Sequence, residues 1–177
     1  MKKRRLSILL SIVMLLSLLP TTALAADTYP TASEVCVDGG KYFGEPGSYY
    51  FKNNETACSK NSTGYNAYYN PTTGTLTLDG YNGGSITVGG TKSKITVVLV
   101  GNNIIDNGSL TSAWGGDITI KSSSGGTLSI TNTLNGGNAA IGIETGLSAS
   151  YTTGNVTIKG NAKVTINMTH NGTSTYE

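Results

Sequence analysis

Arginine is almost missing from this chain: its only copies, Arg4 and Arg5, lie at the very start of the 177 residues. Without arginine in the body of the chain, the usual bidentate clamp for phosphate or carboxylate groups is missing. Histidine is equally scarce, because His170 is the single copy and lies far from both cysteines. The sequence therefore carries no zinc-ligand spacing, and we expect no metal site with His and Cys ligands.

The chain also lacks an apolar run long enough for a membrane span. Lys2–Arg5 form a basic segment, Leu6–Leu19 form an apolar segment, and Ala23–Ala25 supply the small residues that a signal peptidase accepts. This order predicts a secretory signal peptide over residues 1–25, cleaved between Ala25 and Ala26. A transmembrane anchor is the weaker interpretation, because a bilayer-spanning helix needs about 20 apolar residues. We expect a secreted protein, extracellular or associated with the cell surface, without membrane insertion after cleavage.

Removal of the signal peptide changes the charge of the chain. Four of the 12 basic residues belong to the signal peptide, so the mature chain keeps eight lysines against 10 acidic residues. Its net charge is then about −2, whereas the whole chain has a net charge of +2. No basic patch is left that could replace the counterions of a nucleic acid, so we expect no nucleic-acid partner.

Cysteine is limited to Cys36 and Cys58. In an exported chain an even pair predicts a disulfide, which here closes a loop of about twenty residues and contributes roughly 3 kcal/mol. The alternative is two free, buried thiols, as found where oxidation is weak.

Helical periodicity is absent as well. No stretch after the signal peptide sustains the 3.6-residue apolar period of an amphipathic helix. A short unit recurs instead, in which a Thr or Ser stands between two aliphatic residues and glycine or asparagine turns separate the copies. Because side chains alternate between the two faces of a strand, each unit predicts a strand with its aliphatic residues on one face. The copies are Thr75–Leu78, Ile86–Val88, Ile95–Val97, Ile118–Ile120, Leu128–Ile130, Val156–Ile158 and Val164–Ile166.

A ladder of such strands predicts an all-β fold, specifically a right-handed parallel β-helix (a solenoid). Leu76, Val97 and Ile118 follow one another at intervals of 21 residues, and Ile141 follows after 23. Coils of about this length carry two or three short strands each, so Ile118 and Leu128 would lie on successive strands of one coil. The hexapeptide period of left-handed β-helices and the calcium-binding nonapeptide are both absent.

Residues 26–73 differ from the ladder and predict an N-terminal antiparallel β cap on a solenoid of residues 74–177. They hold seven of the 10 tyrosines and both phenylalanines. Glu34–Val37 and Ser48–Lys52 are the expected first strands, and a turn at residues 38–40 ends the first of them. An open solenoid end exposes backbone and core, which is the reason to expect a distinct terminal unit there.

A hairpin is predicted to lead from this cap into the first coil. Tyr65–Tyr69 precedes Asn70-Pro71-Thr72-Thr73-Gly74, and Thr75–Leu78 follows. Pro after Asn, with Gly three positions later, is typical of a type I turn followed by a left-handed residue.

Two further features concern surfaces. Ile95–Val100 is apolar on both faces, so its outer side is either covered, for example by the cap, or exposed as an apolar stripe. The last aliphatic strand is followed by polar residues to Glu177, with no capping helix or aromatic closing segment. We therefore expect an open last coil, in a chain that is the front of a longer protein or a truncated reading frame.

The stretch from Tyr69 to Gly83, Tyr-Asn-Pro-Thr-Thr-Gly-Thr-Leu-Thr-Leu-Asp-Gly-Tyr-Asn-Gly, resembles secreted surface proteins of Firmicutes. These are described as right-handed β-helix or carbohydrate-binding-domain proteins. Their later coils are similar to Leu99–Ile105 and Gly116–Ile120 here. The resemblance implies the same fold and a surface location, but its motifs are architectural and carry no functional residues over to this chain.

The leading functional hypothesis is a non-catalytic module that binds polysaccharide or acts as an adhesin. Sugar recognition uses flat aromatic platforms, and the candidates are Tyr65, Tyr68, Tyr69, Tyr81 and Trp114. The alternative for the tyrosines is that they pack the cap against the first coil, and for the tryptophan that it covers an edge of the solenoid.

Two other functions stay open. A polysaccharide lyase or glycosidase would need clustered carboxylates, whereas Asp79, Asp106, Asp117 and Glu144 are spread one per turn region and are typical turn formers. No catalytic residue is therefore predicted, no cofactor is expected, and a Ca²⁺ site of turn oxygens has no location in the sequence. A purely structural stalk or spacer would also suit the low charge and the abundant Thr, Ser, Asn and Gly.

Overall fold

The computed structural model is all-β, as the sequence predicts, because its described residues form strands and turns and no helix. In the part of the chain that it describes, no helix has the length and apolarity to cross a membrane. The described residues are 32, 34–38, 40–43, 49–53, 64–89, 93–135, 142–146 and 154–171. The predicted signal peptide, its cleavage point at Ala25 and Ala26, and Cys58 lie outside them.

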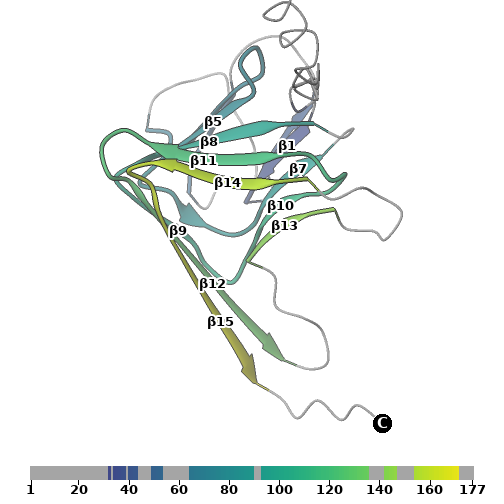
Figure 1. Ribbon diagram of the computed structural model, residues 1–177, viewed down its shortest axis with the longest axis vertical. Helices are drawn as coiled ribbons and strands as arrows, with labels where there is room; N and C mark the ends of the chain where they lie inside the picture. The colour runs from purple at the N-terminus through teal and green to yellow at the C-terminus, as the bar shows by residue number, and fades with distance from the viewer. Residues whose placement is uncertain are drawn as a thin grey trace, which may run out of the picture.

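Three sheets with parallel strands make up most of the fold (Figure 1). The six-stranded sheet has the order β14-β11-β8-β5-β4-β3, the four-stranded sheet β15-β12-β9-β6, and the five-stranded sheet β13-β10-β7-β1-β2. The strands of the parallel region are β5 (Thr75–Asp79), β6 (Asn82–Gly83), β7 (Ile86–Gly89), β8 (Ile95–Val100), β9 (Asn102–Ile105), β10 (Leu110–Ser112), β11 (Ile118–Ser122), β12 (Thr127–Asn135), β13 (Ile143–Thr145), β14 (Val156–Gly160) and β15 (Lys163–Asn171).

The chain visits the three sheets in a fixed cycle. It passes from the six-stranded to the four-stranded to the five-stranded sheet in β5–β6–β7, again in β8–β9–β10 and again in β11–β12–β13. β14 and β15 then return to the first two sheets. Ile118 and Leu128 thus lie on successive strands of one cycle, as the sequence predicts.

The register differs from the predicted period after the second cycle. Leu76 pairs with Val97, as expected from 21-residue spacing, but Val97 pairs with Ile120 rather than with Ile118. Ile118 instead lies beside Ile95. The prediction was wrong by two residues because the connection between β9 and β10 (residues 106–109) is two residues longer than the connection between β6 and β7 (residues 84–85), so the second cycle takes 23 residues. Ile141 lies outside the described residues.

Antiparallel strands extend two of the sheets at the N-terminal end: β1 (Glu34–Val37), β2 (Gly40–Phe43), β3 (Tyr49–Phe51) and β4 (Ala67–Asn70). β1 pairs with β7 and with β2, and β4 pairs with β5 and with β3. The first strand matches its predicted bounds, but Gly40, predicted as part of a turn, begins β2. Asp38 makes the sharp reversal with a φ of 48°.

The predicted hairpin is confirmed. Asn70 pairs with Thr75 across the turn, and Gly74 has the left-handed φ of 61° that follows a type I turn. The Asn70 side chain stabilises the turn, because its Oδ1 accepts hydrogen bonds from the amides of Thr72 (3.0 Å) and Thr73 (3.3 Å). Proline at position 71 suits the turn because it needs no donor there.

The core consists of the inward-facing aliphatic residues of all three sheets. On β8, Ile95, Val97 and Leu99 are buried, whereas the outward-facing Val98 is half-buried and Val100 is 39% exposed. Of the two alternatives for this strand, the exposed apolar stripe therefore holds at Val100. The buried hydrophobic residues are Ala32, Val35, Val37, Phe51, Ala67, Tyr69, Leu76, Leu78, Tyr81, Ile86, Val88, Ile95, Val97, Leu99, Ile105, Leu110, Ile118, Ile120, Leu128 and Ile130.

Two corners of the parallel region share one turn, with the sequence Ser-x-x-Gly-Gly. In Ser112–Gly116 and in Ser122–Gly126, the serine hydroxyl is buried and accepts a hydrogen bond from the amide of the last glycine, at 3.1 and 2.8 Å. The first glycine of each pair has a positive φ, 79° at Gly115 and 85° at Gly125. This repeat was not recognised in the sequence, although both copies stand there ten residues apart.

A buried asparagine joins three consecutive cycles. Asn103 is 1% exposed, and its Oδ1 accepts a hydrogen bond from the amide of Tyr81 at 2.9 Å. Its Nδ2 donates to the carbonyls of Thr127 (3.1 Å), Val100 (3.2 Å) and Gly101 (3.4 Å). One side-chain amide thus forms hydrogen bonds with backbone groups of three cycles: the preceding cycle, its own and the following one. At this buried position water cannot supply these bonds.

Candidate functional site

The outer face of the six-stranded sheet carries one continuous row of side chains. Each member is paired in register with the next, so the row runs across all six strands at the strand spacing of about 4.8 Å. It begins with aromatic residues on β3 and β4 and ends with cations on β11 and β14. The row is Tyr50, Tyr68, Thr77, Val98, Lys121 and Lys159.

Three half-buried tyrosines form an aromatic cluster at the start of this row. The Tyr50 and Tyr68 rings are stacked, with centroids 4.8 Å apart and planes at 21°. Tyr65 is tilted against both, 5.0 Å from Tyr50 and 6.0 Å from Tyr68. Strand alternation places the Tyr50 and Tyr68 rings outward, because Phe51 and Ala67 occupy the buried face of β3 and β4. Such stacked and tilted pairs are favourable aromatic arrangements.

A second row beside the first is almost entirely threonine. Asn70 pairs with Thr75, which pairs with Thr96, then Thr119, then Thr157. The amide of Asn70 also donates to the Tyr68 hydroxyl at 3.4 Å, so the two rows touch at the aromatic end. The result is a regular array of hydroxyl groups alongside the first row.

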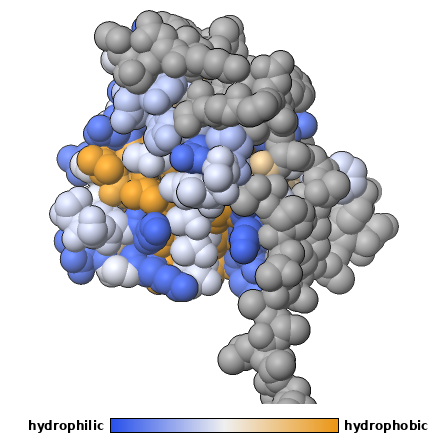
Figure 2. Space-filling view, turned by 90° about the horizontal axis from the view of Figure 1, so that it is seen from above, coloured by the Kyte–Doolittle hydropathy of each residue, from blue (hydrophilic) through white to orange (hydrophobic). Residues whose placement is uncertain are grey.

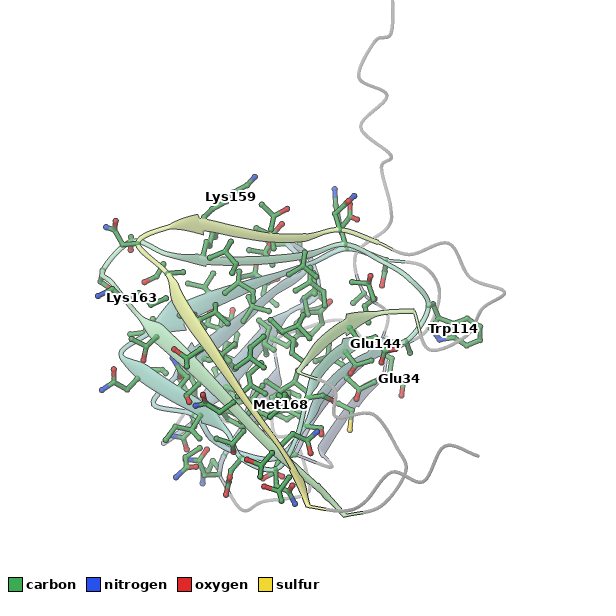
Figure 3. The ribbon with its side chains drawn as sticks, turned by 60° about the horizontal axis from the view of Figure 1, so that its bottom comes forward. Glu34, Trp114, Glu144, Lys159, Lys163 and Met168 are labelled. Atoms are coloured by element: carbon green, nitrogen blue, oxygen red, sulfur yellow. The ribbon has the colours of Figure 1, made fainter. Side chains whose placement is uncertain are left out.

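The two lysines at the far end of the first row are exposed. Lys159 points away from the sheet in Figure 3. This sheet lies uppermost in Figure 1 and is viewed from above in Figure 2, where apolar surface lies among hydrophilic side chains. The face therefore combines aromatic, aliphatic, hydroxyl and cationic groups within one sheet.

Two of the predicted aromatic candidates are in the core and are corrected here. Tyr69 is fully buried, and its hydroxyl donates to the Ala32 carbonyl at 2.7 Å. Tyr81 is 1% exposed, and its hydroxyl donates to the Gly84 carbonyl at 3.0 Å. Neither ring has a face available for a ligand, so the packing alternative is the correct one for both. Tyr65 and Tyr68 are brought together, and Tyr50, which the sequence analysis did not single out, completes the cluster.

Tyr81 is expected to make stability depend on alkaline pH. Burial raises the pKa of its hydroxyl, and the Asp38 carboxylate and the Cys36 thiol raise it further. The folded chain then keeps the phenol protonated while the unfolded chain ionises near pH 10, so stability falls as pH rises above about 10.

Tyr81→Phe tests this expectation. It should cost about 1 kcal/mol at pH 7, because one hydrogen bond is lost, and should make the alkaline loss of stability shallower. Urea unfolding midpoints measured between pH 7 and 10.5 would show it. Parallel pH profiles for the variant and the wild type would refute the role of this hydroxyl.

Trp114 lies on a different part of the molecule from the tyrosines. It is 39% exposed in the Ser112–Gly116 turn, and it projects from the corner before β11 (Figure 3). β8 and β5 separate β11 from β4 in the sheet, so the structure does not bring Trp114 to the aromatic cluster.

The acidic candidates are likewise dispersed, and two of them, Asp117 and Asp106, form hydrogen bonds at turns. Asp117 Oδ1 accepts from the amide of Asn155 at 2.8 Å, and Asp106 Oδ1 accepts from the Thr131 hydroxyl at 2.7 Å. Asp79 ends β5, and Glu144 lies in β13 on another sheet. Within the described ranges, no group of three or more His, Cys, Asp or Glu could hold a metal ion.

Cys36 carries a free, half-buried thiol in this structure. Its predicted partner, Cys58, lies outside the described residues. The disulfide between them therefore stays a prediction.

A shallow depression of about 550 Å³ lies at the corner between the last two cycles. No aromatic ring lines it, so it lacks the platform that sugar recognition uses. Its lining residues are Ser123, Ser124, Gly125, Gly160, Asn161, Ala162 and Lys163.

Comparison with protein families, with curated proteins and with solved structures finds no match. Sequence reasoning missed Tyr50 because the local sequence does not show that β3 pairs with β4, or which residues of the two strands lie side by side. The available signal was its alternation with Phe51, which directs one ring outward and the other inward.

Proposed function

We propose that this protein is a non-catalytic, secreted module that binds polysaccharide at the cell surface or outside the cell. The observation that carries the proposal is the Tyr50–Tyr65–Tyr68 cluster at the head of an ordered row across six strands. A cluster of aromatic rings on an outer face offers the flat apolar surface that pyranose rings stack on.

We also propose the finer architecture that fits such a module. Residues 74–177 would be the coils of a right-handed parallel β-helix, residues 26–73 an antiparallel cap, and residues 1–25 a cleaved signal peptide. The repeated cycle through three sheets supports coils, and crossovers between parallel strands are right-handed in nearly all proteins. Antiparallel pairing of β1 with β7 and of β4 with β5 supports a cap at that end.

The row favours a polymer over a single sugar. Tyr68 is flanked on one side by Tyr50 and on the other by Thr77, whose short side chain leaves room above the sheet. A chain laid along the row from Tyr68 would pass a hydroxyl of the neighbouring row at each strand. Regular hydrogen-bonding groups beside an apolar stacking surface match the alternating polar edges and apolar faces of an extended glycan.

Binding is favoured over hydrolysis by where the acidic residues lie. Glycoside hydrolysis needs two carboxyl groups facing each other across the scissile bond, with a separation of roughly 5–10 Å. Asp117 and Asp106 are engaged in turns on different corners, and Glu144 is on a different sheet from the tyrosine cluster.

Retention on insoluble glycans tests the proposal. The chain beginning at Ala26 should be retained on one of cellulose, pectin, mucin glycans or peptidoglycan. Tyr68→Ala and Tyr50→Ala should each weaken retention about tenfold or more, because a central aromatic contact is removed. Tyr68→Phe, which keeps the ring, should retain most of the binding, and Trp114→Ala should bind like the wild type.

Three other results of this experiment would contradict the proposal, and each would favour a different function or site. Retention on none of the glycans would favour a stalk or spacer. Release of reducing or unsaturated sugar ends would show an enzyme. Loss of retention in Trp114→Ala but not in Tyr68→Ala would move the site to the β10–β11 corner.

A further inference from the structure

The C-terminal end of the parallel region exposes side chains that are buried everywhere else in the stack. β13, β14 and β15 are the outermost strands of the three sheets, and they frame the end that faces the viewer in Figure 3. Ile158 is 52% exposed, whereas Ile120, its partner one cycle earlier, is fully buried. Ile166 is 45% exposed, although its partner Ile130 is fully buried. Val156 (44%) follows the same pattern, because its partner Ile118 is fully buried. Met168, which pairs with the half-buried Asn132, is 38% exposed.

Among the described residues, no strand pairs with the outer edge of β15, which runs over nine residues. The amide of Lys163 donates to the Gly126 carbonyl at 3.1 Å, toward the neighbouring β12. Alternate residues of a parallel strand bond the same neighbour, so Val164, Ile166 and Met168 direct their N–H and C=O groups toward the open side. An exposed strand edge of this kind is a template for another strand.

We propose that two copies of this chain associate end to end through these edges, with β15 of one copy antiparallel to β15 of the other. The twofold axis would pass through Asn167, the middle residue of the strand, because this alignment pairs the strand over its whole length. The proposal is independent of the glycan site, which lies on the outer face of a different sheet.

The opposite end of the molecule excludes a head-to-tail arrangement. There the edges of β5 and β7 are already occupied by β4 and β1, so a second copy cannot continue these two sheets. A head-to-tail stack needs both ends open, whereas a twofold contact needs only one. When the C-terminal ends of two copies meet, their β15 strands can pair only in the antiparallel direction.

The register about Asn167 is self-complementary. Ile166 of one copy lies opposite Met168 of the second copy on the inward face, and Thr165 lies opposite Thr169 on the outward face. Apolar pairs and threonine pairs across antiparallel strands are both favourable. The two Lys163 residues lie at opposite ends of the paired strands, about 27 Å apart, so their like charges do not meet. The same rotation brings β14 of one copy to β13 of the other, which covers Val156 and Ile158.

Site-directed cross-linking tests the axis directly. Residues at position 167 would form a non-hydrogen-bonded pair with Cα atoms about 4.5 Å apart, within the range of a disulfide. In a background with Cys36→Ser and Cys58→Ser, Asn167→Cys should become mostly disulfide-linked dimer under mild oxidation. Thr165→Cys is the matched control, since its two copies would lie about 13 Å apart and should not become disulfide-linked. Equal cross-linking of both variants, or none in Asn167→Cys, would overturn the proposed pairing.

Sedimentation equilibrium of the chain beginning at Ala26 tests the association without cross-linking. We expect a reversible dimer, and Ile166→Lys or Met168→Lys should raise its dissociation constant at least tenfold while the far-UV spectrum is unchanged. Ser124→Lys, which adds the same charge at an exposed corner, should dimerise like the wild type. A wild-type chain that is monomeric at 100 µM would refute the proposal. Glycan retention should persist in Ile166→Lys, so the two proposals can fail separately.

Discussion

Gly116→Ala is expected to destabilise this protein by at least about 3 kcal/mol, which is a large share of the stability of a typical domain. A Cβ at this position would overlap the carbonyl oxygen of Ser93 and lie 2.7 Å from its backbone nitrogen. Both obstacles are backbone atoms of the preceding cycle, so no side chain can rotate out of the way. Relief would require two cycles to move apart at a corner where the strands on either side are held in register.

Gly101→Ala is the matched control, because it adds the same methyl group where nothing lies within 4 Å. Its only penalty is the left-handed backbone with a φ of 62°, worth about 1–2 kcal/mol. Equilibrium urea unfolding followed by circular dichroism would compare the two variants. If both lose the same stability, the close approach of the two cycles at Gly116 is looser than the structure describes.

Asn103→Leu should have the second largest effect, a loss of about 2–4 kcal/mol. The leucine is similar in size, but it leaves the Tyr81 amide without its acceptor and takes one donor away from the Thr127 carbonyl, in a site that is 1% exposed. Asn102→Leu makes the same change at the exposed neighbouring position and should cost less than about 1 kcal/mol. Thermal or urea unfolding of both variants provides the measurement, and equal losses would contradict a special role for Asn103.

Asn103→Asp tests the same site through the direction in which stability changes with pH. The introduced carboxylate would face the carbonyls of Val100 and Thr127, so burial and repulsion would raise its pKa on folding. An acid whose pKa is raised on folding destabilises the fold as pH rises above its ordinary pKa of about 4. The stability deficit relative to the wild type should therefore be larger at pH 7 than at pH 4. A deficit that does not change with pH would contradict this arrangement of the amide.

Much of the fold could be predicted because strand formation depends on neighbouring residues. The alternation in Thr75–Leu78 and Ile118–Ile120 places aliphatic residues on one face, and the structure buries those residues. The Asn70–Gly74 turn was predictable for the same reason, since proline, asparagine and glycine restrict the backbone locally. The all-β class followed from the same pattern.

The register between strands of successive cycles could not be predicted from the local sequence pattern. Ile118 and Ile120 are equally good partners for Val97 by residue type, and the connection of residues 106–109, which is two residues longer than its counterpart at residues 84–85, decides between them. The register that results places Gly116 against the backbone of Ser93, which is a contact between separate cycles. No window of neighbouring residues contains both sides of this contact.

The candidate site also has a part that the local sequence determines and a part that depends on strand pairing. Alternation along the chain already determines that Tyr68 faces out and Tyr69 faces in, once the strand is known. Tyr81 lies between strands, where alternation gives no direction. In the structure its amide donates to Asn103 and its hydroxyl donates to Gly84, and both bonds hold it on the inner side. Tyr50 joins Tyr68 only because β3 pairs with β4 in one register. Side-chain direction is thus a local property, whereas adjacency is set by backbone pairing between distant segments, which packing of the whole stack selects.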